Sequence, residues 1–182
     1  MTASITFFPV GNGDMTLITF DNDQKLLADL HVRNAADDED DETPNVMADL
    51  RERLSRDEKG RLFVDGFLLS HPDKDHICGL ETHFHLGPPD EWVKCDDKIL
   101  IREMWSSPIV FRRASKNHVL CDDAKAWAKE ARRRVALFRE KGTATVEGDR
   151  IQIMGEDDDG KTDDILAIVV KAGGLVSKLN RI

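Results

Sequence analysis

The sequence predicts an α/β (α+β) domain in which short strands and helices intermix along the chain. Several apolar runs are rich in β-branched and aromatic residues and are bounded by Gly, Asn and Asp, which is typical of strands. Residues 122–141 contain neither Gly nor Pro and carry apolar side chains at helical spacing. No internal repeat orders these elements, so we expect one domain over residues 1–182.

Three short strands are expected at the N-terminus. Residues 4–10 (SITFFPV) and 15–20 (MTLITF) flank Gly11-Asn12-Gly13-Asp14, whose backbone freedom suits a tight hairpin turn. A third apolar run at 25–30 follows the polar turn at 21–23. Together these runs predict a small antiparallel meander.

An acidic loop and a helix are expected next. Residues 37–42 (DDEDDE) repel one another, so residues 33–43 are interpreted as a mobile, solvated loop, since a calcium loop would need interleaved spacing and a glycine turn. Thr43 is a candidate N-cap with Pro44 at the first helical position. The apolar residues that follow predict a helix of about three turns that ends near Gly60: Val46, Met47, Leu50 and Leu54.

Four further candidate strands lie beyond residue 60. Residues 64–69 form a nearly continuous apolar run, which is typical of a buried strand. Residues 99–105 predict another strand. The last two are expected at 151–154 and 165–170, on either side of the acidic loop at 156–164.

The longest predicted helix covers residues 122–141. Acidic residues occupy its start, basic residues occupy its end, and Gly142 follows it, as the helix dipole and C-cap preferences favour. Its buried stripe is expected to comprise Ala124, Trp127, Ala131, Val135 and Phe138.

The charge balance limits the surfaces with which the protein is expected to interact. Lys and Arg number 26 and Asp and Glu 35, and the resulting net charge of −9 argues against a broad nucleic-acid or anionic membrane surface. Basic residues cluster at Arg112-Arg113 with Lys116 and at Arg132-Arg133-Arg134. These clusters predict either phosphate contacts or, with Glu130 and Glu140 nearby, a salt-bridged solvent face.

The cysteines and the N-terminal residues indicate the cellular compartment in which the protein is expected. Cys78, Cys95 and Cys121 form no CxxC pair, so neither a disulfide framework nor a cysteine zinc ribbon is indicated. The N-terminus lacks a basic region followed by a long apolar one, and no apolar run approaches the ~18 residues needed to span a bilayer. We therefore expect a cytoplasmic protein with reduced thiols.

A cluster of metal-ligating residue types follows the strand at 64–69. In HPDKDH, residues 71–76, an extended backbone would place His71, Asp73 and Asp75 on a common side, with His76 beside them. Imidazoles and carboxylates together suit Zn²⁺, Mn²⁺ or Fe²⁺. The alternative is a surface turn in which Asp75 caps a helix that starts at His76.

Three ordered elements resemble the metallo-β-lactamase superfamily. Residues 70–79 resemble the family's signature loop, a strand followed by Ser-His-x-[His or Asp]-x-Asp-His, an apolar residue and Gly. Residues 9–18 (PVGNGDMTLI) are similar to the first hairpin of the branch related to the DNA-uptake competence hydrolases, and residues 26–30 (LLADL) to its next strand. The resemblance implies an αββα sandwich, of which this chain would contain the first half to two-thirds.

The resemblance also implies a metal-dependent hydrolase with one or two ions. His71 and Asp73 would ligate a first metal, and Asp75 and His76 a second. Asp73 replaces the commoner histidine, which makes Mn²⁺ or Fe²⁺ an alternative to Zn²⁺. Asp75 would orient the metal-activated water and take its proton, so it is the candidate catalytic residue. The branch favours a phosphodiester of a nucleic acid or nucleotide as the substrate.

Other ligands implied by the resemblance are harder to find in this sequence. The family has a third histidine after a strand that residues 148–153 resemble, yet residues 166–176 contain none. The remaining histidines are weak substitutes: His31, His83, His85 and His118. Asp14 and Asp29 are expected beside the ligands. We therefore expect a hydrolase that needs its missing C-terminal half or a companion chain, or alternatively a non-catalytic interaction module of a larger complex.

Overall fold

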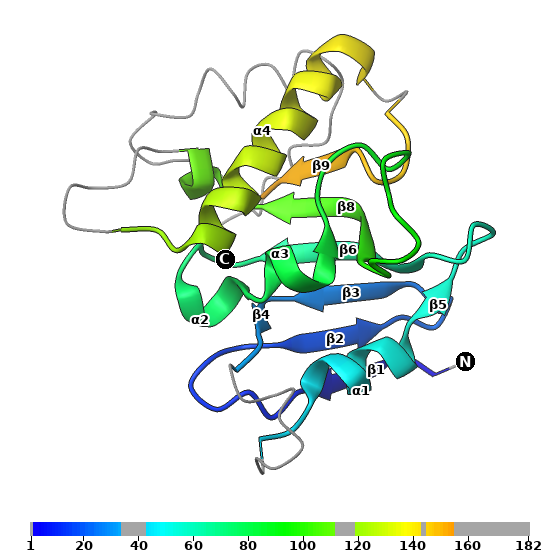
Figure 1. The fold of residues 1–182 in the computed structure, drawn as a ribbon, viewed down its shortest axis with the longest axis vertical. Coiled ribbons are helices and arrows are strands. Elements are labelled where there is room, and N and C mark those ends of the chain that lie inside the picture. Colours follow the sequence, from blue (N-terminus) through cyan, green and yellow to red (C-terminus); the bar gives the residue numbers. More distant parts are fainter. Residues whose placement is uncertain (1, 34–42, 112–118, 143–144, 155–182) are drawn as a thin grey trace.

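The computed structural model describes residues 2–33, 43–111, 119–142 and 145–154 (Figure 1). It contains one mixed sheet with the strand order β1-β2-β3-β6-β8-β7, in which β5 also pairs with β6 and β9 with β8. The strands are β1 (Ser4–Phe7), β2 (Thr16–Thr19), β3 (Lys25–Ala28), β4 (Leu30–His31), β5 (Ser55–Arg56), β6 (Leu62–Leu69), β7 (Phe84–His85), β8 (Ile99–Ser106) and β9 (Arg150–Ile153). The helices are α1 (Val46–Arg53), α2 (Lys74–Ile77), α3 (Leu80–His83) and α4 (Asp122–Lys141), with a 3₁₀ turn η1 (Pro108–Phe111). The predicted mixed α/β class is confirmed.

The N-terminal antiparallel meander is confirmed, but its strands are shorter than expected: β1 ends at Phe7 instead of residue 10, and β3 ends at Ala28 instead of residue 30. Strands β1 and β2 are antiparallel, as are β2 and β3, and Leu17 pairs with Leu27. Both leucines are buried on the same face of the sheet.

The central strands are parallel, and this fixes where the candidate site lies. Strand β6 is parallel to both β3 and β8, and β9 is parallel to β8. The strands expected at 64–69, 99–105 and 151–154 therefore exist, with β6 beginning earlier, at Leu62, and β8 ending later, at Ser106. Because β3 and β6 are parallel neighbours, the residues that follow them emerge at one edge of the sheet.

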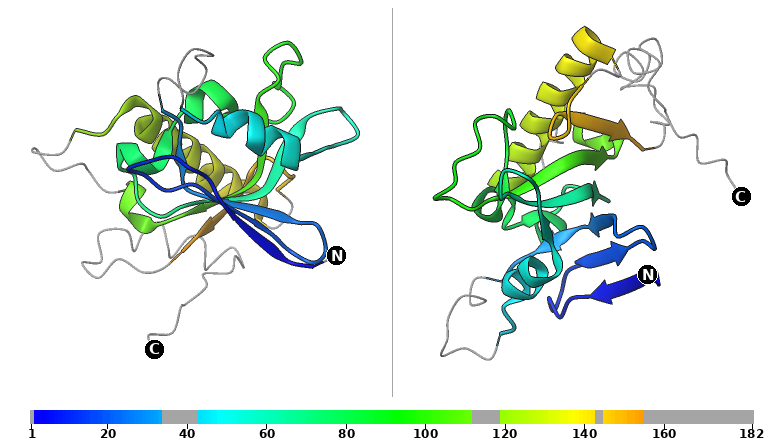
Figure 2. Two further views of the ribbon diagram at one scale, coloured as in Figure 1. Left: turned by 90° about the horizontal axis from the view of Figure 1, so that it is seen from below. Right: turned by 90° about the vertical axis from the view of Figure 1, so that its right-hand side faces the viewer.

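Helix α4 matches its predicted range, and every residue of its predicted stripe is buried. The indole of Trp127 packs edge-on against Phe67, with ring centroids 4.9 Å apart, and its Nε1 donates to Ser106 Oγ. Helices α1, α3 and α4 lie on the same side of the sheet (Figure 2). None of these three helices covers the other side of the sheet.

The basic cluster on α4 is salt-bridged, as one of its two interpretations expected, but much of it is buried. Arg133 and Arg134 both pair with Glu130, which is only 4% exposed, and Arg133 also pairs with Asp149. Arg134 is fully buried and donates to the carbonyl oxygen of Ile101. It therefore anchors α4 to the sheet and cannot contact a substrate phosphate.

Helix α1 is shorter than the sequence predicted and begins later. Asn45, rather than Thr43, is the N-cap, and its side chain accepts a hydrogen bond from the backbone N–H of Ala48. The helix ends at Arg53 instead of continuing towards Gly60, because Ser55–Arg56 pairs with β6 as strand β5. Pairing with the sheet thus overrides the local helical pattern.

Several predictions concern residues outside the described part of the chain. These are the acidic stretch within 33–43, the cluster Arg112-Arg113 with Lys116, His118, the acidic loop at 156–164 and the strand at 165–170. Among the described residues, no helix has the length and apolar character needed to cross a membrane.

Candidate metal centre

The candidate site is assembled where β3 and β6 end. Asp29 follows β3 directly, and Ser70 and His71 follow β6. The backbone N–H of Asp29 donates to Leu68 of the neighbouring strand, and Asp29 adopts a left-handed backbone conformation with φ of 57°. This uncommon conformation in a residue other than glycine turns the chain out of β3 beside His71.

The loop after β6 turns into helix α2 and does not stay extended. The helix begins at Lys74, and the N–H of His76 donates to the carbonyl oxygen of Asp73. The expected extended path through Asp75 is therefore wrong. Its alternative is also wrong in detail, because Asp73 occupies the N-cap position and Asp75 lies within the first turn. Contacts with residues 30–32 hold this four-residue helix in place.

A buried carboxylate links the two histidines of the motif. Asp29 is 6% exposed, and its Oδ2 lies 2.9 Å from Nδ1 of His76 and 2.7 Å from the hydroxyl of Ser70. The same hydroxyl lies 3.0 Å from Nδ1 of His71. A carboxylate only accepts hydrogen bonds, so His76 donates through Nδ1–H. The single hydroxyl proton of Ser70 is donated to Asp29, so His71 must also donate through Nδ1–H.

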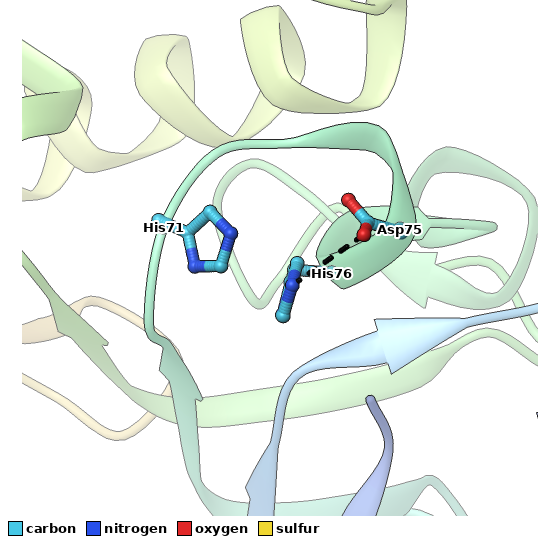
Figure 3. Close-up of side chains that lie close together, drawn as sticks. All are labelled: His71, Asp75 and His76. Atoms are coloured by element: carbon cyan, nitrogen blue, oxygen red, sulfur yellow. Dashed lines mark ion pairs between the residues drawn. The ribbon is translucent and has the colours of Figure 1, made fainter. Parts of the chain in front are cut away.

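These hydrogen bonds leave Nε2 of both imidazoles available as an electron-pair donor. Nε2 of His76 lies 3.7 Å from a carboxylate oxygen of Asp75, and Nε2 of His71 lies 3.6 Å from one of Asp73. The two rings lie side by side with their centroids 3.7 Å apart and their planes tilted by 48° (Figure 3). A histidine whose other nitrogen is held by a carboxylate is the usual arrangement of a metal ligand.

The donor spacing fits a transition-metal ion. His71, Asp75 and His76 each offer one ligand atom, and these atoms lie within 4.8 Å of one another. Ligands bound ~2.1 Å from a tetrahedral zinc ion are about 3.4 Å apart, close to the 3.7 Å between His76 and Asp75. Small side-chain adjustments therefore suffice to close this set around one ion. Asp73 lies beside His71 as a further oxygen donor.

Asp14 and Asp29 both lie beside the motif, as expected, but in different environments. The side chain of Asp14 is 72% exposed, and its Oδ2 is 3.7 Å from Nδ1 of His76. Asp14, Asp29 and His76 form a second group with donor atoms within 4.8 Å. We favour the first group as the metal centre, because Asp29 already occupies Nδ1 of His76 with a hydrogen bond.

The remaining histidines do not complete the ligand set among the described residues. His31 has a buried Nδ1 without a hydrogen-bond partner, and burial lowers its pKa although the Asp75 carboxylate opposes this. Nε2 of His85 lies 2.8 Å from the carbonyl oxygen of Pro88. His83 belongs to α3 and to neither of the two donor groups.

The role of Ser70 in the site was missed from the sequence. Ser70 was part of the quoted motif, but its hydroxyl had no assigned role, and the structure makes it the link between His71 and Asp29. Its position directly before His71 is the signal that was available. Cys78, next to α2, is not a thiolate candidate, because burial and the nearby Asp123 raise its pKa.

Comparison with known proteins gave no relatives for this chain. No protein-family model matches it, and neither a curated protein nor a solved structure is significantly similar. Function is therefore inferred from the residues and their geometry.

Proposed function

We propose that the chain is a metal-dependent hydrolase with a metallo-β-lactamase-like fold and that it cleaves phosphodiester bonds in a nucleic acid or nucleotide. The observation that carries this proposal is the hydrogen-bonded chain from His71 through Ser70 to Asp29 and His76. It directs two imidazole Nε2 atoms towards Asp73 and Asp75. A polar turn without a ligand has no need for two histidines held in one tautomer.

The donor set favours a metal of intermediate hardness. Two nitrogen and up to two oxygen donors suit Zn²⁺, as one or two ions, and are also compatible with Mn²⁺ or Fe²⁺. When bound, the metal supplies the Lewis acidity that makes water nucleophilic near neutral pH. His71 and His76 hold it, and Asp29 keeps both rings in the required orientation.

Asp75 is the proposed proton acceptor. Its side chain is 54% exposed, and it belongs to the same helical turn as the metal ligand His76. A carboxylate in this position can orient the attacking water and accept its proton while remaining in exchange with solvent. Asp75 is therefore assigned both roles, with one carboxylate oxygen available to the metal and the other to the attacking water, whereas His76 in the same turn is a ligand only.

Exposed apolar side chains on the face of the sheet opposite α1, α3 and α4 suggest that a further polypeptide packs there. Strand pairing places Ile5, Phe7 and Ile18 on the same face as Leu68 and Trp105. Ile5 is 59% and Phe7 77% exposed, which is unusual for large apolar side chains on adjacent positions of a sheet. We propose that a C-terminal half or a separate chain covers this face and supplies the remaining metal ligands.

Hydrolysis of bis(p-nitrophenyl) phosphate tests the activity. The assay is run with added Zn²⁺ or Mn²⁺, on the chain alone and together with its companion. We expect turnover that is lost in the double variant His71→Ala and Asp75→Ala, with Lys59→Ala, a substitution of an exposed residue, as the control. Turnover that survives the double substitution would refute the assigned roles. A folded complex without turnover would favour a non-catalytic interaction module.

A further inference from the structure

A cavity of about 510 Å³ opens beside helix α2, on the side of the hairpin turn. Its polar lining comes from the turn, from β4 and the segment after it, and from α2: Asn12, His31, Arg33 and Lys74. We call it the basic cavity. It is separate from the donor group formed by His71, Asp75 and His76, none of which lines it.

The basic cavity has the opposite charge character from the protein as a whole. Among the described residues no Asp or Glu lines it, although the chain contains 35 acidic residues. Two other cavities in the described part of the chain are each lined by three acidic residues, namely Asp21, Asp65 and Glu103 in one and Glu81, Glu91 and Asp96 in the other. A cavity that gathers a guanidinium and an ammonium group in so acidic a protein is suited to an anion.

Glycines in the hairpin turn shape the basic cavity. Gly11 has a φ of 74°, and Nη1 of Arg33 lies 4.0 Å from the position that a Cβ at residue 11 would occupy. A Cβ at Gly13 would lie 1.9 Å from Nδ1 of His31 and 2.7 Å from the carbonyl oxygen of Asp75. The absence of a side chain at Gly13 lets the turn pack against His31 and α2, whereas at Gly11 the positive φ is what favours glycine in the part of the turn that lines the cavity with Arg33.

The basic cavity borders the candidate metal centre through shared elements. Lys74 directly precedes Asp75 in α2, and the N–H of Asp14, at the end of the same turn, donates to the carbonyl oxygen of Asp75. A ligand held by Arg33 and Lys74 therefore lies next to the helix that carries the metal ligands.

We propose that the basic cavity binds a phosphate group of the substrate next to the phosphodiester that is hydrolysed. This inference rests on the proposed function and specifies how the substrate is held. Arg33 offers the planar, bidentate hydrogen-bond donor that phosphate prefers, Lys74 adds a point charge, and the Asn12 amide offers a neutral donor. The phosphate is either the neighbouring one of a nucleic-acid strand or a terminal one of a nucleotide.

Binding to metal-free protein tests this site without any dependence on turnover. The protein is kept in EDTA, and backbone amide NMR signals are followed during titration with the trinucleotide TpTpT, thymidine 5′-monophosphate and uncharged thymidine. We expect both phosphate-bearing probes to shift the signals of Gly11, Asn12, Arg33 and Lys74, with thymidine leaving them unchanged. Tighter binding of TpTpT would show that the bound phosphate belongs to a nucleic-acid strand, and equal or tighter binding of the monophosphate would show that it belongs to a nucleotide.

A pair of matched variants makes the test specific. Arg33→Gln should weaken phosphate binding about tenfold, because one charge-assisted contact is lost. Arg139→Gln removes the same charge from an exposed position in the last turn of α4 and should leave binding within about twofold. Both arginines are exposed, so neither substitution threatens the fold. The proposal is overturned if no probe shifts these signals, or if both variants weaken binding equally.

The two proposals fail independently. Loss of phosphate binding by Arg33→Gln, together with an absence of hydrolysis in the wild type, would retain the anion site and reject the hydrolase. Hydrolysis of bis(p-nitrophenyl) phosphate without phosphate binding by metal-free protein would retain the hydrolase and reject the anion site.

Discussion

Replacement of Asp29 by Asn tests whether this carboxylate organises the metal centre. Asn matches Asp in size and is one of the few residues that tolerate the left-handed backbone found at this position, where φ is 57°. It has one acceptor oxygen in place of two, so it cannot accept from both Ser70 Oγ and His76 Nδ1 while also accepting from the backbone N–H of Ser70. The substitution therefore disturbs hydrogen bonding without disturbing packing.

The expected effects of Asp29→Asn follow from these contacts. Loss of a carboxylate that orients a ligating histidine typically weakens metal binding 10- to 100-fold, or by about 1.4 to 2.7 kcal/mol. In metal-free protein, loss of at least one charge-assisted hydrogen bond should lower the free energy of unfolding by about 1.5–3 kcal/mol. Zinc affinity is measured by competition with a chelator, and stability by urea unfolding in EDTA.

Asp14→Asn is the matched control for this experiment. Asp14 is 72% exposed, and its carboxylate is 3.7 Å from Nδ1 of His76, beyond hydrogen-bonding distance. We expect it to change zinc affinity less than about threefold, since exposed charge pairs contribute little. Equal zinc affinity in wild type and Asp29→Asn would refute the assigned role of Asp29.

Two further predictions concern packing and pH. Gly13→Ala should cost about 3 kcal/mol in urea unfolding and weaken zinc binding, because its Cβ would lie 2.7 Å from the Asp75 carbonyl oxygen. Gly60→Ala is the control, because Gly60 has a φ of 78° but a Cβ there would meet no heavy atom within 4 Å; it should cost only about 1 kcal/mol and leave zinc affinity unchanged. A similar loss of zinc affinity in both variants would contradict the close packing of Gly13. Burial alone would raise the pKa of Glu130, but hydrogen bonds from Arg133 and Arg134 lower this pKa below its usual value of 4.5. The ionised carboxylate therefore stabilises the fold above pH 4.5, and this contribution is lost as the pH falls through the lowered pKa. The stability advantage of wild type over Glu130→Gln should therefore shrink under acid, and an advantage that does not vary with pH would contradict the ion pairs.

Elements with a strong local pattern were predictable from the sequence. The meander follows from two turns between β-rich runs, and α4 from an apolar stripe of five residues with favourable ends. Elements decided by tertiary contacts were not predictable. Asn45 and Thr43 are both good N-caps, so residue type alone does not choose between them, and the end of α1 depends on the pairing of β5 with β6. Helix α2 is too short for periodicity to reveal.

In the candidate site, too, the features with a local sequence pattern were predictable and those that depend on tertiary contacts were not. The residue types at 71–76 indicated a metal, because imidazoles and carboxylates at close spacing carry that signal locally. The pairing of Asp29 with His76 spans 47 residues and depends on the parallel register of β3 and β6. Arg33 borders an acidic stretch in the sequence, so only the fold, which brings it to Lys74, identifies it as part of a basic cavity.

His71, Asp75 and His76 are the proposed ligands of one metal ion. Elemental analysis of the purified chain, after equilibration with Zn²⁺, Mn²⁺ or Fe²⁺ and dialysis, measures this directly. We predict at least one tightly bound ion per folded chain in the wild type, and loss of that ion in His76→Ala with the secondary structure retained. A folded wild-type chain that retains no stoichiometric metal would refute this metal centre.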